Sequence, residues 1–554
     1  MKAPSFLAAV GLLALAFLPL KAQVATPLAP VDTASGKVAG QVLPSGVKAW
    51  LGIRYAQPPT GALRWRPPQP IRWQGVWHAD RYGPECIQPL RAHTQNQYFG
   101  EVPTSEDCLY LNIWAAAKST AASQLPVLVF LHGGGTTVGA GSLLHYNGEN
   151  FARRDAVMVT INYRLRQLGW MAHPELSAEQ GGRSGNYTLQ DMAAALQWVK
   201  DNIAQFGGDP ARVTLMGQSW GATAVFELLL SPRAKGLFQR AVLDSICPAP
   251  AAPVHLFCGF RQAPLADAEK NGLALQAALE APNLAAMRDM PADRILAQPP
   301  RGTQNVDGWF IPRPAQETLR AGQFNDVPIL WTANAEDVDW TRNPFANVRT
   351  AADYRAAAAK AWGEKAGEFL KHYPVADDAQ APAAARRVVI DMGLQQDQRR
   401  CAAVFRRIGA RSNHFLALYQ HKEPIAPGVT YDVGDYPGMT NANLDLVRDG
   451  AIHNFDTAWW FGAYDAFNRL GRKRDITEED RAMSAQMSDM LIAFAASGDP
   501  SIARLKVPAW TPENERRLVI DHAIRVEPMP VAAMDWLAAN PAPGHGPACV
   551  TGAG

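Results

Sequence analysis

A serine lies between two glycines in the stretch GQSWG, residues 217–221. The apolar, strand-like run at 211–217 precedes it, and a helical pattern at 221–230 follows it. In a Gly-x-Ser-x-Gly turn between strand and helix, tight geometry raises the hydroxyl above a sheet, and the helix N-terminus favours developing negative charge. Glycines are needed at the flanking positions because side chains there would clash. The pattern predicts that Ser219 is a nucleophile rather than a serine in an ordinary turn.

Attack by a serine oxygen produces an oxyanion, which needs N–H donors that are already aimed at it. The stretch HGGG at 132–135 ends a continuous apolar run that begins at residue 125. Its glycines let backbone N–H groups approach a ligand closely, so we expect Gly134 and Gly135 to donate, together with the N–H of Trp220. A glycine-rich loop can also cradle phosphate, but no Gly-Lys-Ser/Thr follows this one.

The acid and the base of such a site follow the serine in the chain. After the strand-like run at 327–334 come three acidic candidates, Glu336, Asp337 and Asp339. Spacing alone does not choose among them. The histidines downstream of the acid are His372, His414, His421, His453, His522 and His545. His421 closes a strand-like run, whereas His453 lies in a glycine turn before an aromatic helix, and the pattern alone leaves these two equal.

Strand-like and helical patterns alternate from about residue 120 onward. Apolar runs typical of buried strands are found at 125–135, 156–165, 211–217, 240–245, 327–334 and 414–421. Apolar residues at helical spacing occupy 188–206 and 221–230. This alternation predicts a mostly parallel sheet covered by helices. Residues 260–320 and 340–400 are helical and irregular, and we expect them to be insertions above the sheet that shape a pocket. No linker divides the chain, so residues 23–554 are predicted to form a single domain.

The composition and the N-terminus indicate an exported globular protein. Of 554 residues, 47% are hydrophobic and 19% are charged, and the formal net charge is +2 without a dense basic cluster, which argues against nucleic acid as a partner. Residues 1–22 carry an early lysine, a short apolar stretch and Leu20-Lys21-Ala22, as in a cleaved signal peptide. No later stretch is apolar enough to span a bilayer. We therefore expect a secreted or periplasmic protein without a stable membrane anchor.

Export favours disulfide bonds among the six cysteines. Pairing sequential neighbours is the simplest of the possible arrangements and gives Cys86–Cys108, Cys247–Cys258 and Cys401–Cys549. The cysteines show no Cys-x-x-Cys spacing of a zinc or redox site. We expect no metal and no cofactor.

Longer stretches resemble the type-B carboxylesterases, the cholinesterase-like branch of the α/β-hydrolases. The resemblance is carried by WLGIRYAQPPTGALRWRPPQP (50–70), SEDCLYLNIW (105–114), FAASGDP (494–500) and the long segment 186–222 around the serine. It covers most of the chain after the leader. It implies the α/β-hydrolase fold, a large and mostly parallel twisted sheet flanked by helices, with helical insertions above the active site. It also implies hydrolysis of small carboxylic esters by a serine, through an acyl-enzyme.

The resemblance assigns the acid and the base. The family's acid closes an Asn-x-Asp-Glu-Gly segment, and NAEDV places Asp337 there, with Glu336 as a minor alternative. The family's base lies in a Gly-x-x-His turn, which GAIH matches at His453, while His421 falls on the preceding strand end. By this likeness His453 takes the proton of Ser219 and returns it to the leaving alcohol, and Asp337 orients the imidazole.

The resemblance also bears on the structural residues. It supports Cys86–Cys108 and Cys401–Cys549, whereas Cys247–Cys258 sits earlier than the family's second bridge. It further implies an ion pair between Arg64 and Glu106.

Two positions depart from the family. Trp220 stands where alanine is usual, and Thr136 stands where an aromatic residue is usual. We hypothesise that the tryptophan replaces the missing bulk and forms a wall of the acyl pocket. Two other functions stay open: a specialised enzyme for an unusual natural ester or an amide, and a non-catalytic adhesion protein on the same fold. The second is disfavoured because such relatives typically lose triad members. The sequence does not indicate the oligomeric state.

Overall fold

The computed structural model of the chain describes residues 25–89, 102–246, 262–337, 344–345, 347–424, 426, 451, 453–469 and 474–542. The expected signal peptide at 1–22 lies outside these described residues. So do several residues named above: Cys247, Cys258, Cys549, Asp339 and His545.

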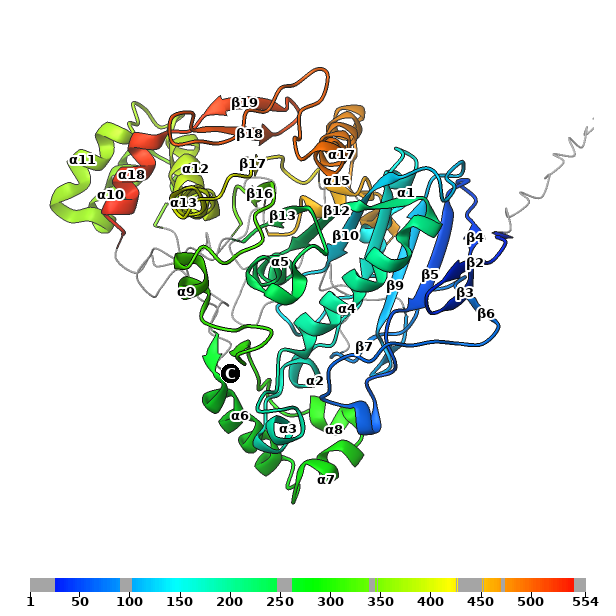
Figure 1. Cartoon of the computed structure of the whole chain (residues 1–554). Helices are drawn as coiled ribbons and strands as arrows, with labels where there is room; N and C mark the ends of the chain where they lie inside the picture. Colours follow the sequence, from blue (N-terminus) through cyan, green and yellow to red (C-terminus); the bar gives the residue numbers. More distant parts are fainter. Residues whose placement is uncertain are drawn as a thin grey trace, which may run out of the picture.

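A large mixed sheet runs through the described part of the chain, in the order β1-β4-β5-β9-β11-β10-β12-β13-β16-β17-β18-β19 (Figure 1). Its central strands are parallel neighbours: β11 (Val157–Ile161), β10 (Leu125–Leu131), β12 (Gly208–Gln218), β13 (Arg240–Asp244), β16 (Ile329–Asn334), β17 (His414–Tyr419) and β18 (Arg516–Ile520). Antiparallel strands extend both edges: β1 (Thr26–Pro27), β4 (Gln41–Val42), β5 (Lys48–Arg54) and β9 (Tyr110–Ala115) at one, β19 (Arg525–Pro528) at the other. The predicted α/β fold with a parallel central sheet is confirmed.

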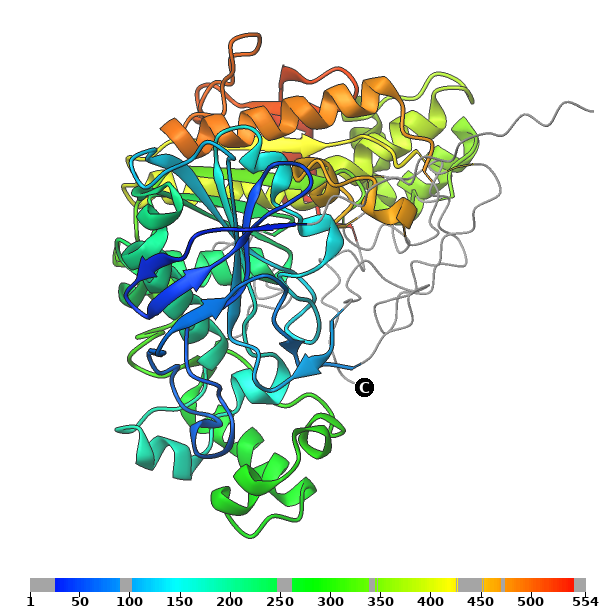
Figure 2. The ribbon, with the colours of Figure 1, turned by 90° about the vertical axis from the view of Figure 1, so that its right-hand side faces the viewer.

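Helices cover both faces of this sheet, as the two perpendicular views show (Figures 1 and 2). One layer contains α4 (Tyr187–Asn202), α5 (Trp220–Leu230) and α13 (Leu394–Arg407); the other contains α1 (Glu149–Ala152), α15 (Thr457–Trp460) and α17 (Glu478–Ser497). Successive side chains of β10 pack alternately against the two helical layers. Val129 packs with the α5 layer, while Leu128 and Phe130 pack with the α17 layer. Because both faces are buried, the strand reads as a continuous apolar run rather than an alternating one.

Two helical groups lie beyond the sheet. The first contains α6 (Leu265–Ala278), α7 (Leu284–Asp289) and α8 (Ala292–Leu296), at the bottom of Figure 1. The second contains α10 (Ala351–Trp362), α11 (Ala366–His372), α12 (Ala381–Met392) and the late helix α18 (Val531–Ala539), at the upper left. Each group packs into a hydrophobic cluster that is separate from the two clusters on the faces of the sheet. The segments expected to be insertions are therefore helical and lie at the margins of the sheet.

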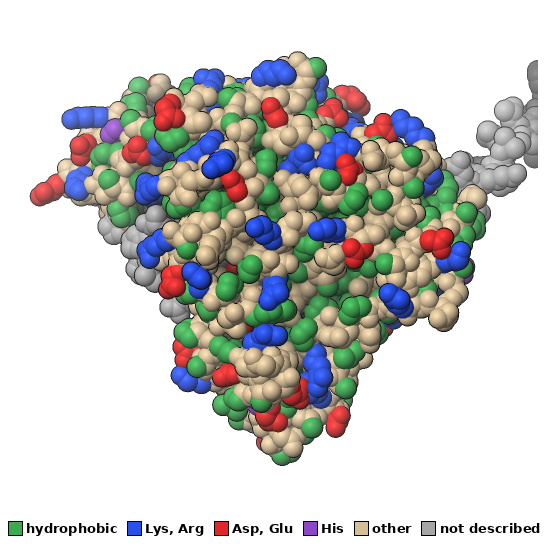
Figure 3. Space-filling view, in the orientation of Figure 1, with side chains coloured by type: hydrophobic (Ala, Val, Ile, Leu, Met, Phe, Trp, Pro, Cys, Tyr) green, Lys and Arg blue, Asp and Glu red, His purple; other side chains and the backbone are tan. Residues whose placement is uncertain are grey.

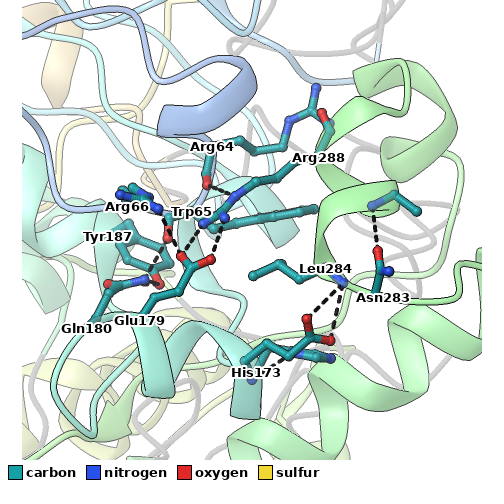
Figure 4. A network of polar contacts seen from close by, with 12 residues as sticks. Arg64, Trp65, Arg66, His173, Glu179, Gln180, Tyr187, Asn283, Leu284 and Arg288 are labelled. Carbon is teal, nitrogen blue, oxygen red and sulfur yellow. Dashed lines mark hydrogen bonds and ion pairs between the residues drawn. The ribbon is translucent and has the colours of Figure 1, made fainter.

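Arg64 fastens α7 to the N-terminal part of the chain. Its guanidinium donates two hydrogen bonds to Glu106, of 2.5 and 2.7 Å, which is the ion pair implied by the resemblance. Its Nη1 also donates to three carbonyl oxygens at the end of α7, those of Met287, Arg288 and Met290. Figure 4 shows Arg288 returning a bond to the Arg64 carbonyl and pairing with Glu179. The last carbonyls of a helix lack some of their partners within it, and Arg64 supplies donors to those at the end of α7.

Disulfide bonds, the character of the helices and the surface charges bear on where the protein is found. Cys86 and Cys108 form a disulfide, and Cys401 on α13 is disulfide-bonded as well, although its expected partner lies outside the described residues. Of the helices described here, none has the length and apolar character needed to cross a membrane. On the face seen in Figure 3, basic and acidic side chains are interspersed.

Candidate active site

Ser219 forms the turn between β12 and α5, and its backbone has φ 54° and ψ −125°. This conformation is unfavourable for a residue with a side chain and persists only where the surroundings impose it. The surroundings do so through a hydrogen bond of 2.9 Å from the Ser219 N–H to the Asp244 carbonyl. A Cβ at Gly217 would lie 2.3 Å from the Gly221 carbonyl oxygen, and one at Gly221 would lie 2.2 Å from that of Leu131. Both positions therefore require glycine, because other backbone atoms approach them too closely for a side chain. The Gly-x-Ser-x-Gly pattern, called the nucleophile elbow, predicts this.

The structure brings Ser219, His453 and Asp337 together from three separate segments. His453 Nε2 lies 2.7 Å from the Ser219 hydroxyl oxygen. Its Nδ1 forms a short hydrogen bond with Asp337, whose other oxygen accepts the N–H of Asn334 at 3.0 Å. Because β16 ends at Asn334, that bond fixes the carboxylate against the end of the strand. The imidazole is 19% exposed and the carboxylate 2%, so a substrate can reach the ring while the acid stays sealed.

The neighbouring charges set the protonation of the imidazole. Burial by itself lowers the pKa of His453, but the charge and hydrogen bond of Asp337, with a contribution from Asp456, raise that pKa above its ordinary value. The ring is therefore a stronger base than a free imidazole, and its cation is stabilised once it has taken a proton.

The other candidate acid has different partners. Glu336 forms an ion pair with Arg386 and accepts the N–H of Ala451 at 3.2 Å. Its carboxylate therefore holds the segment that leads to the histidine, while the neighbouring Asp337 contacts the ring.

The other candidate bases lie elsewhere. His421, which the sequence pattern ranked equal to His453, contacts Asp480 at 3.1 Å. His414 is fully buried, and burial lowers its pKa to about 3. His372 lies against Trp536. His522 hydrogen-bonds to Asp480.

Two buried aspartates that sequence reasoning missed lie behind the triad. Asp456 accepts hydrogen bonds of 3.0 Å from Asn334 and from Trp460, and Asp244 accepts one of 2.7 Å from Thr332. The two carboxyl groups also hydrogen-bond to each other. Burial raises the pKa of both, the charge of Asp456 raises that of Asp244 further, and the charge of Asp337 raises that of Asp456 further. A shared proton explains this arrangement because two neighbouring buried carboxylates cannot both ionise. The sequence signal was weak: an acid at the end of one strand, and another three positions after the histidine.

Gln218 is a second residue that sequence reasoning missed. Its Nε2 lies 3.3 Å from Nε2 of His453, and the side chain is buried beside the nucleophile. An amide NH₂ directed at Nε2 fits a ring in which Nε2 is the unprotonated nitrogen. The proton is then on Nδ1, facing Asp337, which is the tautomer that a general base needs.

The glycine loop predicted to stabilise the oxyanion has the expected backbone freedom. Gly134 and Gly135 have φ of 102° and 61°, and a Cβ built at Gly135 would meet nothing within 4 Å. Trp220 is the first residue of α5, so its N–H is one of the donors that a helix leaves free at its start. Trp220 as a whole is 8% exposed, and its ring packs against those of Trp170 and Tyr163, with centroids 5.1 and 6.0 Å away.

Comparison with known proteins agrees with this geometry. The sequence profile described as "Carboxylesterase family" matches residues 27–529. The chain belongs to this family. It is 38% identical to the fumonisin B1 esterase of Sphingopyxis macrogoltabida over 386 residues, 68% of each chain. It is 30% identical to the para-nitrobenzyl esterase of Bacillus subtilis (strain 168) over 509 residues, 90% of this chain and 96% of that one. A solved structure of PNB esterase matches with a TM-score of 0.68 and 27% identity, covering 92% of this chain and 98% of that one. This carboxylesterase is therefore an α/β-hydrolase and an enzyme of the ester-hydrolase class.

Proposed function

We propose that this carboxylesterase cleaves carboxylic esters through an acyl-enzyme on Ser219. His453 removes the hydroxyl proton as the oxygen attacks the ester carbonyl, and it then protonates the leaving alcohol. Water, activated by the same ring, attacks the acyl-enzyme and restores the serine. Asp337 keeps the ring in its Nδ1–H tautomer and stabilises the cation. The observation that carries this proposal is the continuous path from the Ser219 oxygen through both ring nitrogens of His453 to Asp337.

The charge that develops on the carbonyl oxygen needs donors of its own. We assign this role to the N–H groups of Gly134, Gly135 and Trp220. The positive φ angles of the glycines and the open space beside Gly135 support the assignment. Donors fixed in advance stabilise an oxyanion without reorganising during the reaction.

The substrate proposed is a small-molecule ester. The sequence left open an enzyme specialised for an unusual natural ester, and the 38% identity to a fumonisin B1 esterase favours keeping that candidate. Fumonisin B1 therefore belongs in the substrate panel beside p-nitrobenzyl and p-nitrophenyl esters of increasing acyl length. Higher kcat/KM on fumonisin B1 than on every simple ester would favour the specialised enzyme.

We also propose that residues 1–22 are removed on export and that residues 23–554 form one domain. The Cys86–Cys108 disulfide supports an oxidising compartment. The mass of the N-terminal peptide of the exported protein tests the cleavage site. Retention of the leader in the exported protein would contradict it.

The triad is tested by covalent labelling. The purified enzyme is treated with a fluorophosphonate, assayed on p-nitrophenyl acetate, digested and mapped by mass spectrometry. We expect one modified peptide, labelled at Ser219, with activity lost in proportion to labelling. A Ser219→Ala variant is the matched control and takes up no label. Labelling at another serine with parallel loss of activity would overturn the proposal.

A further inference from the structure

His421, which the catalytic site does not use, lies in a second cluster of histidine and aspartate side chains. It follows the end of β17. Asp521 and His522 follow β18, in the turn that leads to β19, and Asp480 lies in the first turn of α17. Three elements that are far apart in the chain thus bring two imidazoles and two carboxylates to one place at the edge of the sheet.

The donor atoms are close enough to share one ion. One atom from each of His421, Asp521 and His522 lies within 4.8 Å of the others. Asp480 Oδ1 lies 2.7 Å from His522 Nε2 and 3.1 Å from His421 Nε2, and Asp521 Oδ1 lies 3.9 Å from His421 Nδ1. Ligands of a tetrahedral zinc ion lie about 2.0–2.2 Å from the metal and therefore roughly 3.3 Å from one another. The observed separations fall on both sides of that value.

His421 supplies an independent sign that something else binds here. The residue is 3% exposed, and within the described part of the chain its Nε2 has no hydrogen-bond partner, because the approach to Asp480 lacks hydrogen-bond geometry. A buried ring nitrogen without a partner is costly. A metal ion would supply the missing interaction, since a neutral imidazole nitrogen is a common ligand for it.

The carboxylates are held in position for such a role. The second oxygen of Asp480 accepts the N–H and the hydroxyl of Thr477 at the start of α17, which leaves Oδ1 directed at the two rings. Asp521 accepts the N–H of His522 at 2.9 Å. Hydrogen bonds of this kind orient metal ligands and are part of a metal site.

We propose that His421, His522 and Asp521, with Asp480 beside them, bind a divalent transition metal ion of the zinc type. Two nitrogen and two oxygen donors suit zinc rather than magnesium or calcium, which prefer oxygen alone. The ion would join β17, the β18–β19 turn and the start of α17. None of the residues assigned to catalysis takes part, so the site is structural: its loss leaves ester hydrolysis in place and weakens the fold.

The experiment is equilibrium dialysis of the metal-stripped enzyme against Zn²⁺, with the bound metal counted by mass spectrometry. Three proteins are compared: the unmodified chain, His522→Ala, and His78→Ala as a control that removes an exposed histidine from β6 (Val76–His78). His522 is the ligand to change because its side chain is 48% exposed, so its removal leaves the core intact. We expect one zinc ion per chain in the unmodified and His78→Ala proteins and loss of that ion in His522→Ala.

A second measurement separates a metal site from a polar network that merely holds the turn. Zn²⁺ should raise the unfolding temperature of the unmodified and His78→Ala proteins and leave that of His522→Ala unchanged. Co²⁺ in place of zinc should give the intense visible absorption of a tetrahedral site. Equal zinc uptake by the unmodified and His522→Ala proteins, or no uptake by either, would overturn the proposal.

Discussion

Two histidines of this carboxylesterase have nearly the same surroundings and different consequences. His453 and His421 both approach the carboxyl ends of neighbouring parallel strands, and both lie against aspartates. The difference is at the other ring nitrogen. Nε2 of His453 contacts the hydroxyl of Ser219, which lies on a strained turn. Both ring nitrogens of His421, in contrast, face carboxylates. An imidazole–carboxylate pair becomes a general base only when the second nitrogen faces a proton to remove.

The surrounding charges sharpen this contrast. Asp456 lies behind His453 and next to Asp244, and burial raises the pKa of both carboxyl groups, which favours their neutral forms. Around His421 two carboxylates, those of Asp480 and Asp521, lie close to two imidazoles. A full pair of negative charges suits a cation, while a single sealed carboxylate suits a base that must release its proton in each cycle.

The largest expected effect separates the two histidines directly. His453→Ala and Ser219→Ala should each lower kcat for p-nitrophenyl acetate on the order of 10⁶-fold, because members of a triad act as a unit. His421→Gln, which keeps a polar side chain, should leave kcat within about twofold of the unmodified enzyme. Initial rates, divided by enzyme concentrations determined from absorbance, measure both effects. A loss in His421→Gln as large as in His453→Ala would remove the distinction between the two rings.

The next effect compares the adjacent acids. Asp337→Asn should lower kcat about 10⁴-fold because an amide favours the wrong imidazole tautomer. Glu336→Gln should cost far less, since Glu336 holds Arg386 and the backbone of Ala451. Circular dichroism of both variants controls for folding. The reverse order of effects would transfer the role of the acid to Glu336.

A smaller effect concerns Trp220, which the sequence suggested as a wall of the acyl pocket. The residue is 8% exposed, and its ring packs against Trp170 and Tyr163. Trp220→Ala should improve kcat/KM for long acyl chains relative to acetate by about 10-fold, the scale of a changed apolar pocket. Because the backbone N–H remains, oxyanion stabilisation is kept. The same order of preference in both enzymes would leave the ring with a packing role alone.

The smallest effect is a shift in pH dependence. The base must be neutral, so kcat/KM falls as the pH drops through the pKa of His453 in the free enzyme. Because neighbouring carboxylates raise that pKa, activity is lost at a higher pH than for an ordinary imidazole. Asp456→Asn removes one of the raising charges and should move the acidic limb to lower pH. His421→Gln is the control and should leave it in place, and a shift to higher pH in Asp456→Asn would contradict the assignment.

Local features were predictable from the sequence, and features that depend on packing were not. The elbow could be read because Gly217 and Gly221 mark close backbone contacts, and the strands could be read because a sheet buried on both faces gives continuous apolar runs. The pattern could not separate His421, which closes a strand-like run, from His453, which lies in a glycine turn, because only the three-dimensional arrangement shows which ring meets the serine. The family resemblance separated them.

The partners behind the site were hidden for the same physical reason. Asp244 and Asp456 come from segments more than two hundred positions apart, and in the sequence each looks like an ordinary acidic residue; only the fold shows the burial that raises the pKa of both. Gln218 was overlooked because its position next to the nucleophile carries no pattern, and only its distance to the ring reveals the contact. Sequence patterns predict where the backbone requires a particular residue type, such as glycine, but they do not predict which buried side chains contact one another.

The nucleophile elbow also indicates which positions should be randomised in a mutant library designed to change the ester preference. Positions 217 and 221 cannot accept any side chain, because even a methyl group would collide with a carbonyl oxygen. Position 220 between them contributes its N–H whatever side chain it carries, and its ring faces other aromatic side chains rather than backbone. Randomising residue 220 together with Trp170 should therefore yield many folded variants, while any randomisation of the two glycines would mostly produce inactive protein.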